Sequence, residues 1–508
     1  MSLARSWSVA VVGVDGHLVE VEADLAAGLP GLSLVGLPDA SLHEARDRVK
    51  AAVINSGLAW PQHRITVGLS PAALPKSGSS FDLAIAAAVL AASEIVPAEA
   101  VGRRVLFGEL GLDGRVRPVR GVLPAVLAAA RGGCERVVVP VGNAAEAALV
   151  PGLAVEAVES LAGLVNVLTG ESAGATVIAP FDTPSDAPGG PDLADVVGQA
   201  EARLALEVAA AGGHHLLLTG PPGAGKTLLA ERLPGLLPPL DDQTALEVTA
   251  VHSVLGLLPP EVPLVRRPPF RAPHHSASLV SLVGGGGRVL RPGAVSAAHG
   301  GVLFLDEAPE FAAGILDALR QPLESGVVEI ARASGTARFP ARVQLVLAAN
   351  PCPCAPARDV DCTCASTVRR RYQSRLSGAL LDRVDLRQVV QPLSRADLLS
   401  PDVTAESTES VRARVLEARS AAAVRWVGRP WRVNAGAPGS VLRRELRLPP
   451  VTIASASRAL ERGLLSARGF DRVLRVAWTL ADLGGRLTPA AHDIEAALGL
   501  RGVHRAAA

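Results

Sequence analysis

Residues 215–233 read HLLLTGPPGAGKTLLAERL, and this stretch is the strongest indication of the fold. An apolar run leads into a glycine-rich turn, and the turn leads into a segment with helical spacing. The turn matches G-x-x-x-x-G-K-T, in which glycines let backbone N–H groups surround phosphates while the helix N-terminus adds positive charge. The stretch predicts a nucleotide-binding loop in an α/β domain. Its residues are Gly220, Pro221, Pro222, Gly223, Ala224, Gly225, Lys226 and Thr227, with Lys226 on the β- and γ-phosphates and Thr227 on Mg²⁺.

Two more apolar runs end in residues suited to the same chemistry. In GGVLFLDEAPEF, residues 300–311, Asp306 can hold Mg²⁺ directly or through water, and Glu307 can act as general base. In RVQLVLAANP, residues 342–351, the Asn350 amide can orient the attacking water, although a turn-forming Asn before Pro is the alternative. Together the three strands predict an ATPase of the AAA+ type.

Composition and periodicity divide the chain into four parts. Residues 1–175 alternate strand-like and Ala-rich helical runs, and residues 176–192 are rich in Pro, Gly and Asp, which is typical of a linker. Residues 193–395 form the second α/β part. Residues 396–508 show helical periodicity over 452–469, 471–485 and 490–500, which predicts a small helical bundle.

The overall composition argues against nucleic-acid binding through global charge or base stacking, and against a membrane span. The formal net charge is +1 and aromatic residues make up 3% of the chain, so neither a global polyanion-binding charge nor base stacking is predicted. No apolar run reaches the ~20 residues of a membrane span, so no membrane contact is expected.

Four of the five cysteines lie in CPCAPARDVDCTC, residues 352–364. This clustering favours a reduced, cytoplasmic protein over a disulfide framework. Four thiolates at this spacing could hold one Zn²⁺ tetrahedrally, with free thiols as the alternative. The ligands would be Cys352, Cys354, Cys362 and Cys364. Because the loop follows Asn350 directly, a metal there would shape the surroundings of the nucleotide site.

The chain resembles the YifB/ComM family, bacterial AAA+ proteins related to the ATPase subunit of magnesium chelatase. The resemblance rests on DVVGQAEARLALEVAAAGGHHLLLTGPPGAGKT, PFRAPHHSAS, GGVLFLDEAPEF, QLVLAANPCPC and SGALLDRVDL. It implies a Lon-protease-like (ribosomal S5 domain 2-like) N-terminal domain, an AAA+ P-loop NTPase core and a C-terminal helical lid domain. It also implies ATP and Mg²⁺ as cofactors.

The resemblance implies three further site residues. Arg383 resembles the arginine finger that enters the neighbouring subunit's site, which implies a ring, most simply a hexamer. Arg468 resembles a lid arginine facing the γ-phosphate, with Arg472 as a competitor. Val197, within DVVGQ, resembles the lining of the adenine pocket. From the residues alone, Arg383 could instead be a surface arginine paired with Asp382 or Asp385.

In the N-terminal part, PKSGSS, residues 75–80, resembles the turn that carries the nucleophile of Lon proteases. The resemblance places Ser80 at the nucleophile, but the lysine of the Ser-Lys dyad is replaced by Leu123, which cannot accept a proton. We therefore expect a protease fold without protease activity.

Arginines fall where this branch of AAA+ proteins inserts loops into the ring channel. They could contact phosphates without reading bases, while solvated surface arginines or intersubunit pairs are the alternative. These residues are Arg266, Arg267, Arg271, Arg288, Arg291, Arg332 and Arg338. His274 and His275 are predicted to be packed or capping residues rather than metal ligands, and RRRYQSR, residues 369–375, to form subunit contacts.

The family implies DNA as partner, with helicase or branch-migration activity during recombination in natural transformation. The alternatives are a chelatase-type ATPase that remodels a protein partner, an ATP-dependent protease, and a scaffold that binds ATP without hydrolysing it. Leu123 disfavours the protease, and the complete set of acidic and basic site residues disfavours the scaffold.

Overall fold

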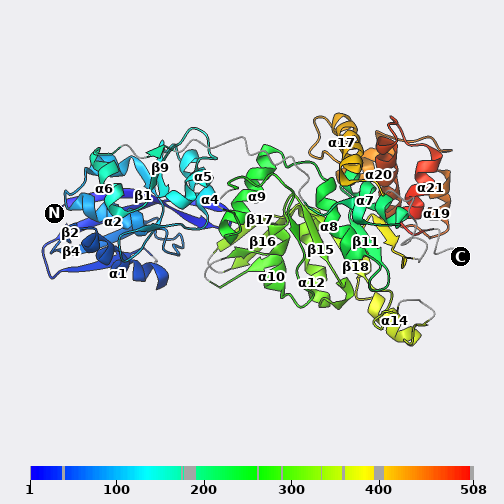
Figure 1. Cartoon of the computed structure of the whole chain (residues 1–508), viewed down its shortest axis with the longest axis horizontal. Coiled ribbons are helices and arrows are strands. Elements are labelled where there is room, and N and C mark those ends of the chain that lie inside the picture. The colour runs from blue at the N-terminus through cyan, green and yellow to red at the C-terminus, as the bar shows by residue number, and fades with distance from the viewer. Residues whose placement is uncertain are drawn as a thin grey trace.

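The computed structural model describes residues 2–36, 40–172, 175–176, 190–259, 262–287, 290–332, 335–356, 361–393 and 405–503. Three regions follow one another along the longest axis: a sheet with helices at the N-terminal end, a second sheet in the middle, and helices at the C-terminal end (Figure 1). None of the helices in these ranges is long and apolar enough to cross a membrane.

The N-terminal region is built on an eight-stranded mixed sheet, in the order β10-β9-β8-β5-β1-β2-β4-β3. From Val19 to Leu25 of β2 every second side chain is buried, so the period-2 pattern of the sequence gives the sheet a covered face. The strands are β1 (Ser2–Val12), β2 (Asp15–Ala26), β3 (Gly31–Val35), β4 (Arg64–Ser70), β5 (Arg104–Leu106), β8 (Arg136–Pro140), β9 (Ala154–Val158) and β10 (Ala175–Thr176), beside a small pair, β6 (Glu109–Leu110) and β7 (Val116–Arg117). The helices are α1 (Ala40–Asn55), α2 (Asp82–Ala92), α3 (Ala98–Gly102), α4 (Val122–Arg131), α5 (Ala144–Ala147) and α6 (Leu161–Thr169).

Helix α4 joins the N-terminal region to the middle region by packing against α9 (Asp242–Leu255). Leu123 of α4 and Val248 of α9 belong to one hydrophobic cluster. The backbone N–H of Gly121 donates to the Ser253 carbonyl over 3.3 Å. Because apolar packing is close to crystal density, a core shared by two regions holds them in one relative position.

The middle region contains a five-stranded sheet in the order β12-β15-β18-β11-β19, with every neighbouring pair parallel. Strands β15 and β18 are buried at every position, as expected of continuous apolar runs covered on both faces. The strands are β11 (Leu216–Thr219), β12 (Phe270–Arg271), β15 (Val302–Leu305), β18 (Gln344–Ala349) and β19 (Leu386–Val389). The helices are α7 (Ala200–Gly212), α8 (Lys226–Leu236), α9, α10 (Leu279–Val283), α11 (Ala294–Ala297), α12 (Ala313–Ala318), α13 (Arg320–Ser325), α14 (Ser366–Gln373) and α15 (Gly378–Leu381). Of these, α14 projects away from the sheet (Figure 1).

Two antiparallel strand pairs lie beside this sheet. The first pairs β13 (Gly284–Gly285) with β14 (Arg291–Pro292), and the second pairs β16 (Val327–Arg332) with β17 (Gly335–Pro340). The β16–β17 hairpin touches the N-terminal region, since a Cβ at Gly13 would lie 3.2 Å from the Ala337 Cβ.

The C-terminal region, over residues 405–503, contains helices and no strand. These are α17 (Thr408–Arg425), α18 (Gly439–Arg444), α19 (Ala454–Glu461), α20 (Ala467–Leu483) and α21 (Ala491–Leu500). The periodic segment 452–469 is divided between α19 and α20, because Gly463 takes a left-handed φ of 72° after α19. Ser466 then caps α20 by accepting a hydrogen bond from the Gly469 N–H over 3.0 Å.

The predicted regions appear in the predicted order, with a parallel sheet in the middle and a helical bundle at the end. The expected linker, 176–192, and the expected boundary between residues 395 and 396 fall mostly outside the described ranges. The domain bounds therefore stay predictions.

Candidate active site

The glycine-rich loop connects β11 to α8. Gly223 and Gly225 have φ values of 74° and 94°, which glycine adopts without steric cost. Position 220 has no room for a side chain, because a Cβ there would lie 2.3 Å from the Val390 carbonyl oxygen. The loop thus makes the tight turn that a phosphate cradle requires, at the N-terminus of a helix.

Lys226 brings two strand ends together. Its Nζ donates to the carbonyls of Gly220 and Pro221 over 2.8 and 2.9 Å, and to Asn350 Oδ1 over 3.0 Å. Burial lowers the pKa of Lys226, and the negative charges of Asp306 and Glu307 oppose that shift. A cationic amine and an amide therefore meet where the carboxyl ends of β11 and β18 converge.

The end of β15 supplies two carboxylates with different surroundings. Thr227 Oγ1 donates to Asp306 Oδ2 over 2.8 Å, so a hydroxyl and a carboxylate oxygen stand together as ligands for a hard cation such as Mg²⁺. Glu307 has a left-handed φ of 49°, and its N–H donates to Asp306 Oδ1 over 2.8 Å. The sharp turn fixes the Glu307 backbone, and the Glu307 carboxylate is close enough to Lys226 for its charge to oppose the lowering of the pKa of that lysine by burial.

The sequence analysis assigned other roles to two residues of this site, since it expected His275 to be packed or capping and placed Tyr372 in a stretch of subunit contacts. His275 Nδ1 lies 3.0 Å from Glu307 Oε2, whereas His274 Nδ1 bonds Ser276 Oγ over 2.8 Å. Tyr372 of α14 is buried, and its hydroxyl is hydrogen-bonded by the Asn350 backbone N–H. Burial, with the charges of Glu310 and Glu307, raises the pKa of Tyr372 to about 12. The histidine pair within PFRAPHHSAS and the only tyrosine of the chain were the available signals.

The DVVGQ segment lies against the loop. Gln199, with a left-handed φ of 56°, donates through Nε2 to the Ala224 carbonyl over 3.3 Å and to the Gln391 carbonyl over 2.5 Å. Val197 is half-buried two residues earlier. The segment is therefore placed beside the nucleotide loop, where a base-lining residue would have to be.

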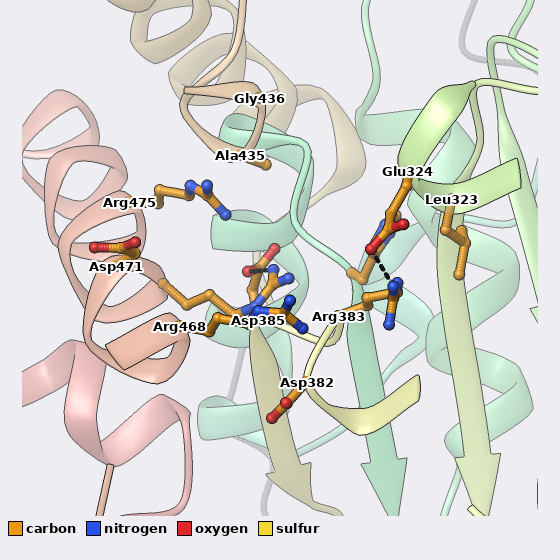
Figure 2. A pocket seen from close by; sticks show the side chains of 12 residues that line it. Leu323, Glu324, Asp382, Arg383, Asp385, Ala435, Gly436, Arg468, Asp471 and Arg475 are labelled. Carbon is orange, nitrogen blue, oxygen red and sulfur yellow. Dashed lines mark hydrogen bonds and ion pairs between the residues drawn. The ribbon is translucent and has the colours of Figure 1, made fainter. Parts of the chain in front are cut away.

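Arg383 and Arg468 lie together, but not beside their own loop. Both line a cavity of about 420 Å³ whose walls include His215 and Asp385 (Figure 2). His215 precedes β11 and Asp385 precedes β19, so the cavity is at the amino ends of strands whose carboxyl ends carry the glycine-rich loop. Arg383 pairs with Glu324, and not with Asp382 or Asp385.

A buried network beneath this cavity holds the lid helix α20 against the sheet. Arg472 pairs with Asp385, which also contacts His214 Nδ1 at 3.2 Å. Thr479 of α20 hydrogen-bonds His214 Nε2 over 2.8 Å. Although burial opposes its ionisation, the His214 hydrogen bond and the charge of Arg472 hold the pKa of Asp385 well below its usual range. Both Arg468 and Arg472 line the cavity, but the ion pair with Asp385 makes Arg472 a structural anchor.

The four clustered cysteines come together as a group. Their sulfurs all lie within 4.8 Å of one another, and the three recorded separations are 3.3, 3.5 and 3.7 Å. Tetrahedral zinc with bonds of ~2.3 Å would place sulfurs about 3.8 Å apart. All are free thiols, and Cys352 is buried. Hydrogen bonds from Cys364 and Cys352 lower the pKa of the Cys354 thiol to about 6. The group therefore fits one metal ion.

Leu123 occupies the position that the resemblance to Lon proteases assigns to the dyad lysine. Leu123 is fully buried in the α4 core, and its N–H donates to Glu146 Oε1 over 2.8 Å. Lys76 points its Nζ to the carbonyls of Gly36, at 3.0 Å, and Pro71.

The candidate channel arginines differ in how exposed their side chains are. Arg332 and Arg338 are exposed on the β16–β17 hairpin, and Arg291 is exposed on β14. Arg266 is instead paired with Asp242 at 2.9 Å, and Arg271 is half-buried. Arg267 is exposed, and Arg288 lies outside the described residues.

Comparison with known proteins covers nearly the whole chain. Family models described as magnesium chelatase, subunit ChlI, as subunit ChlI of Mg-chelatase, and as the ChlI C-terminal part match residues 192–398, 21–143 and 405–501. The chain is 57% identical to Rv2897c of Mycobacterium tuberculosis over 99% of both chains. It is 41% identical to competence protein ComM of Haemophilus influenzae, over 99% of this chain and 98% of that one. Identity to YifB of Escherichia coli is also 41%, over 95% of this chain and 94% of the relative.

A shorter likeness concerns the N-terminal region. It is 32% identical to the Lon protease of Rhizobium meliloti over 146 residues, which is 27% of this chain and 18% of that protein. The predicted fold class, with a Lon-like region, a P-loop core and a helical lid, is confirmed.

The parallel sheet, the glycine-rich loop, the paired acids after β15 and the helical lid define a P-loop ATPase domain of the AAA+ type. The similarity along the full length is more specific. The chain belongs to the YifB/ComM family of magnesium-chelatase-like AAA+ ATPases.

Proposed function

We propose that this protein is a hexameric, Mg²⁺-dependent motor that hydrolyses ATP to move DNA strands, with helicase or branch-migration activity during recombination in natural transformation. One observation carries the proposal. The contacts of Lys226 with Asn350 and of Thr227 with Asp306 assemble a complete hydrolytic site in a chain 41% identical to a competence protein.

Each residue then has a role. The loop N–H groups and Lys226 bind the β- and γ-phosphates, while Thr227 and Asp306 hold Mg²⁺. Glu307 takes the proton of the attacking water, and Asn350 orients that water. Val197 packs against the adenine.

The placement of Arg383 and Arg468 supports a ring, for which we propose six subunits. Both lie at the amino ends of strands whose carboxyl ends carry the loop, so neither can reach the phosphates bound by its own subunit. A neighbouring subunit docked on this cavity would receive both guanidinium groups at its γ-phosphate. A closed ring repeats that contact at every interface, so that each Arg383 reaches the nucleotide site of a neighbouring subunit.

Exposed arginines supply the DNA contact. Arg332 and Arg338 on one hairpin and Arg291 on the adjacent pair present charge without an aromatic platform. Such groups bind phosphates and not base edges, so we propose binding that depends on salt and little on sequence.

The second candidate is a chelatase-type ATPase that remodels a protein partner. The three ChlI family models favour it, whereas the whole-length similarity to ComM, including the N-terminal region, favours DNA. With Leu123 in place of the dyad lysine, we propose that the N-terminal region is not proteolytic.

We also propose a cytoplasmic location, because a DNA partner and cysteines without disulfide bonds are both compatible with the cytoplasm.

ATP hydrolysis measured with different DNAs tests the function. We expect single-stranded DNA or a four-way junction to raise kcat several-fold over DNA-free protein, because polymer binding should complete the ring. Glu307→Gln should abolish both rates. Phosphate release is the measurement. Hydrolysis that ignores every DNA would contradict the proposal and favour the protein-remodelling candidate.

We also propose that the four cysteines hold one Zn²⁺. The purified chain should contain about one zinc per chain by elemental analysis, since four thiolates form a closed structural site. The double variant Cys354→Ser/Cys364→Ser should lose it, whereas Cys134→Ser, at the fifth cysteine, should keep it. A wild-type chain that carries no zinc, and takes up no Co²⁺ with thiolate charge-transfer bands, would show the proposal to be wrong.

A further inference from the structure

Helix α14 contacts the chain where it leaves β18. The Tyr372 hydroxyl accepts a hydrogen bond from the Asn350 backbone N–H. The next residue of the helix, Gln373, donates through Nε2 to the Pro351 carbonyl over 3.2 Å. Two neighbouring side chains of one helix thus hold two consecutive residues, and the first of those residues supplies the amide of the hydrolytic site.

The Asn350 amide depends on the direction of its own backbone. Its Oδ1 accepts from Lys226 Nζ over 3.0 Å, so the side chain must face the glycine-rich loop. The backbone just before it is tied to the same loop, since the Gly220 N–H donates to the Ala349 carbonyl over 3.1 Å. A short side chain follows any rotation of its backbone, and a displacement of about 1 Å in an active site can cost about 100-fold in rate. Contacts that fix the Asn350 backbone therefore bear on hydrolysis.

Apolar packing contributes little to the position of α14. Of its eight residues, all within the described ranges, Tyr372 alone is buried. The helix projects from the sheet (Figure 1), and Val368, one turn before Tyr372, is 47% exposed. A helix this short is not stable by itself in water. Another constraint is needed to keep Tyr372 on Asn350.

The cysteine group joins the end of β18 to the start of α14. Cys352 lies two residues after Asn350, and Cys364 lies two residues before Ser366, where α14 begins. The four sulfurs lie within 4.8 Å of one another. A metal ion bound by all four thiolates would close the loop between them, and loop closure lowers the entropy of the state in which α14 is undocked. The bound ion would therefore hold α14, and with it Tyr372, against Asn350.

We propose that Tyr372 is a positioning residue for Asn350, and that a thiophilic divalent cation on the four cysteines keeps it in place, so that metal occupancy sets the rate of ATP hydrolysis. The inference rests on the proposed function for the role of Asn350 and for the zinc. The hold of α14 on Asn350 rests only on the contacts of Tyr372 and Gln373.

Steady-state ATP hydrolysis by Tyr372→Phe tests the positioning. Phenylalanine keeps the ring and removes the oxygen that accepts the Asn350 N–H, so we expect kcat to fall about 10-fold, as for one hydrogen bond felt in the transition state. The affinity for a fluorescent ATP analogue and the zinc content should stay at wild-type values. Val368→Thr, an isosteric change at the exposed position one turn earlier, is the matched control and should keep kcat.

A double-mutant cycle separates positioning from a general loss of structure. Asn350→Ala should itself lower kcat. Adding Tyr372→Phe to it should cost no more than a further factor of about two, because the backbone then carries no amide to position. Full additivity of the two losses would overturn the proposal, and so would a Tyr372→Phe protein with wild-type kcat.

Removal of zinc tests the role of the metal. Protein stripped by a chelator, and then freed of the chelator, should lose at least as much kcat as Tyr372→Phe and regain it when Zn²⁺ is returned. Amide hydrogen exchange in peptides that contain Asn350 should rise in the stripped protein and fall on reloading, because the Asn350 N–H loses and regains its partner. Wild-type kcat and exchange in the stripped protein would show that the metal does not hold the helix.

The possible failures are distinguishable. If the wild type carries no zinc but Tyr372→Phe lowers kcat without additivity, the positioning stands and the zinc is contradicted. If the wild type hydrolyses no ATP, the proposed function fails, while hydrogen exchange at Asn350 still shows whether the metal holds α14.

Discussion

Glu307→Gln should lower kcat for ATP hydrolysis by at least about 100-fold, the lower range of a general base's contribution, and should leave ATP binding intact. Glutamine preserves the length and shape of the side chain but has no basic oxygen to take a proton. Because Lys226, Thr227 and Asp306 are untouched, nucleotide affinity should change little. Steady-state phosphate release gives kcat, and equilibrium binding of a fluorescent ATP analogue gives the affinity.

Glu310→Gln is the matched control, because Glu310 lies three residues away and pairs with Arg375 at 2.9 Å on the surface. It should keep kcat within about twofold, as expected when only a surface ion pair is lost. A Glu307→Gln protein that keeps more than a tenth of wild-type kcat would show that another group takes the proton.

Arg383→Ala should reduce hydrolysis by about 1,000-fold, the lower range for an arginine finger. The cause is loss of positive charge at the neighbour's γ-phosphate. An equal mixture of Arg383→Ala and Glu307→Gln subunits should regain activity, since about a quarter of random interfaces join an intact site to an intact finger. Phosphate release from the mixture, set against each variant alone, measures this rescue.

Two observations would contradict action in trans. Arg383→Ala could retain activity close to the wild type, or the mixture could be no more active than its components although the variants co-assemble in native mass spectra. Arg320→Ala, which removes a half-exposed arginine from a helix near the same cavity, is the control and should behave like the wild type.

Much of the nucleotide site was predictable because its signals are local. The turn at Gly220 follows from its own chemistry, since only a side chain of hydrogen fits beside Val390. The acids after β15 and the amide after β18 follow from buried apolar runs that end in polar residues. Parallel strands place such ends at one edge of a sheet, which accounts for the 3.0 Å between Lys226 Nζ and Asn350 Oδ1.

The resemblance to Lon proteases, and not local sequence, places Leu123 where the dyad lysine would stand. A leucine cannot accept a proton in any fold, so the replacement at Leu123 needed no coordinates. The grouping of the cysteines was likewise visible in the sequence. Their sulfur separations were not, since they depend on how the loop folds back between Cys354 and Cys362.

Tertiary structure alone decided the placements that depend on contacts between distant segments. His275 meets Glu307 because β12 lies beside β15, and no local pattern encodes that adjacency. Three arginines of α20 line the cavity, but Arg472 is paired with Asp385 and Arg475 donates to the Ala437 carbonyl, whereas no such partner is found for Arg468 among the described residues. Sequence specified the chemistry of each side chain, while the order of strands and the docking of the lid determined which side chains meet, because these contacts join segments far apart in the chain.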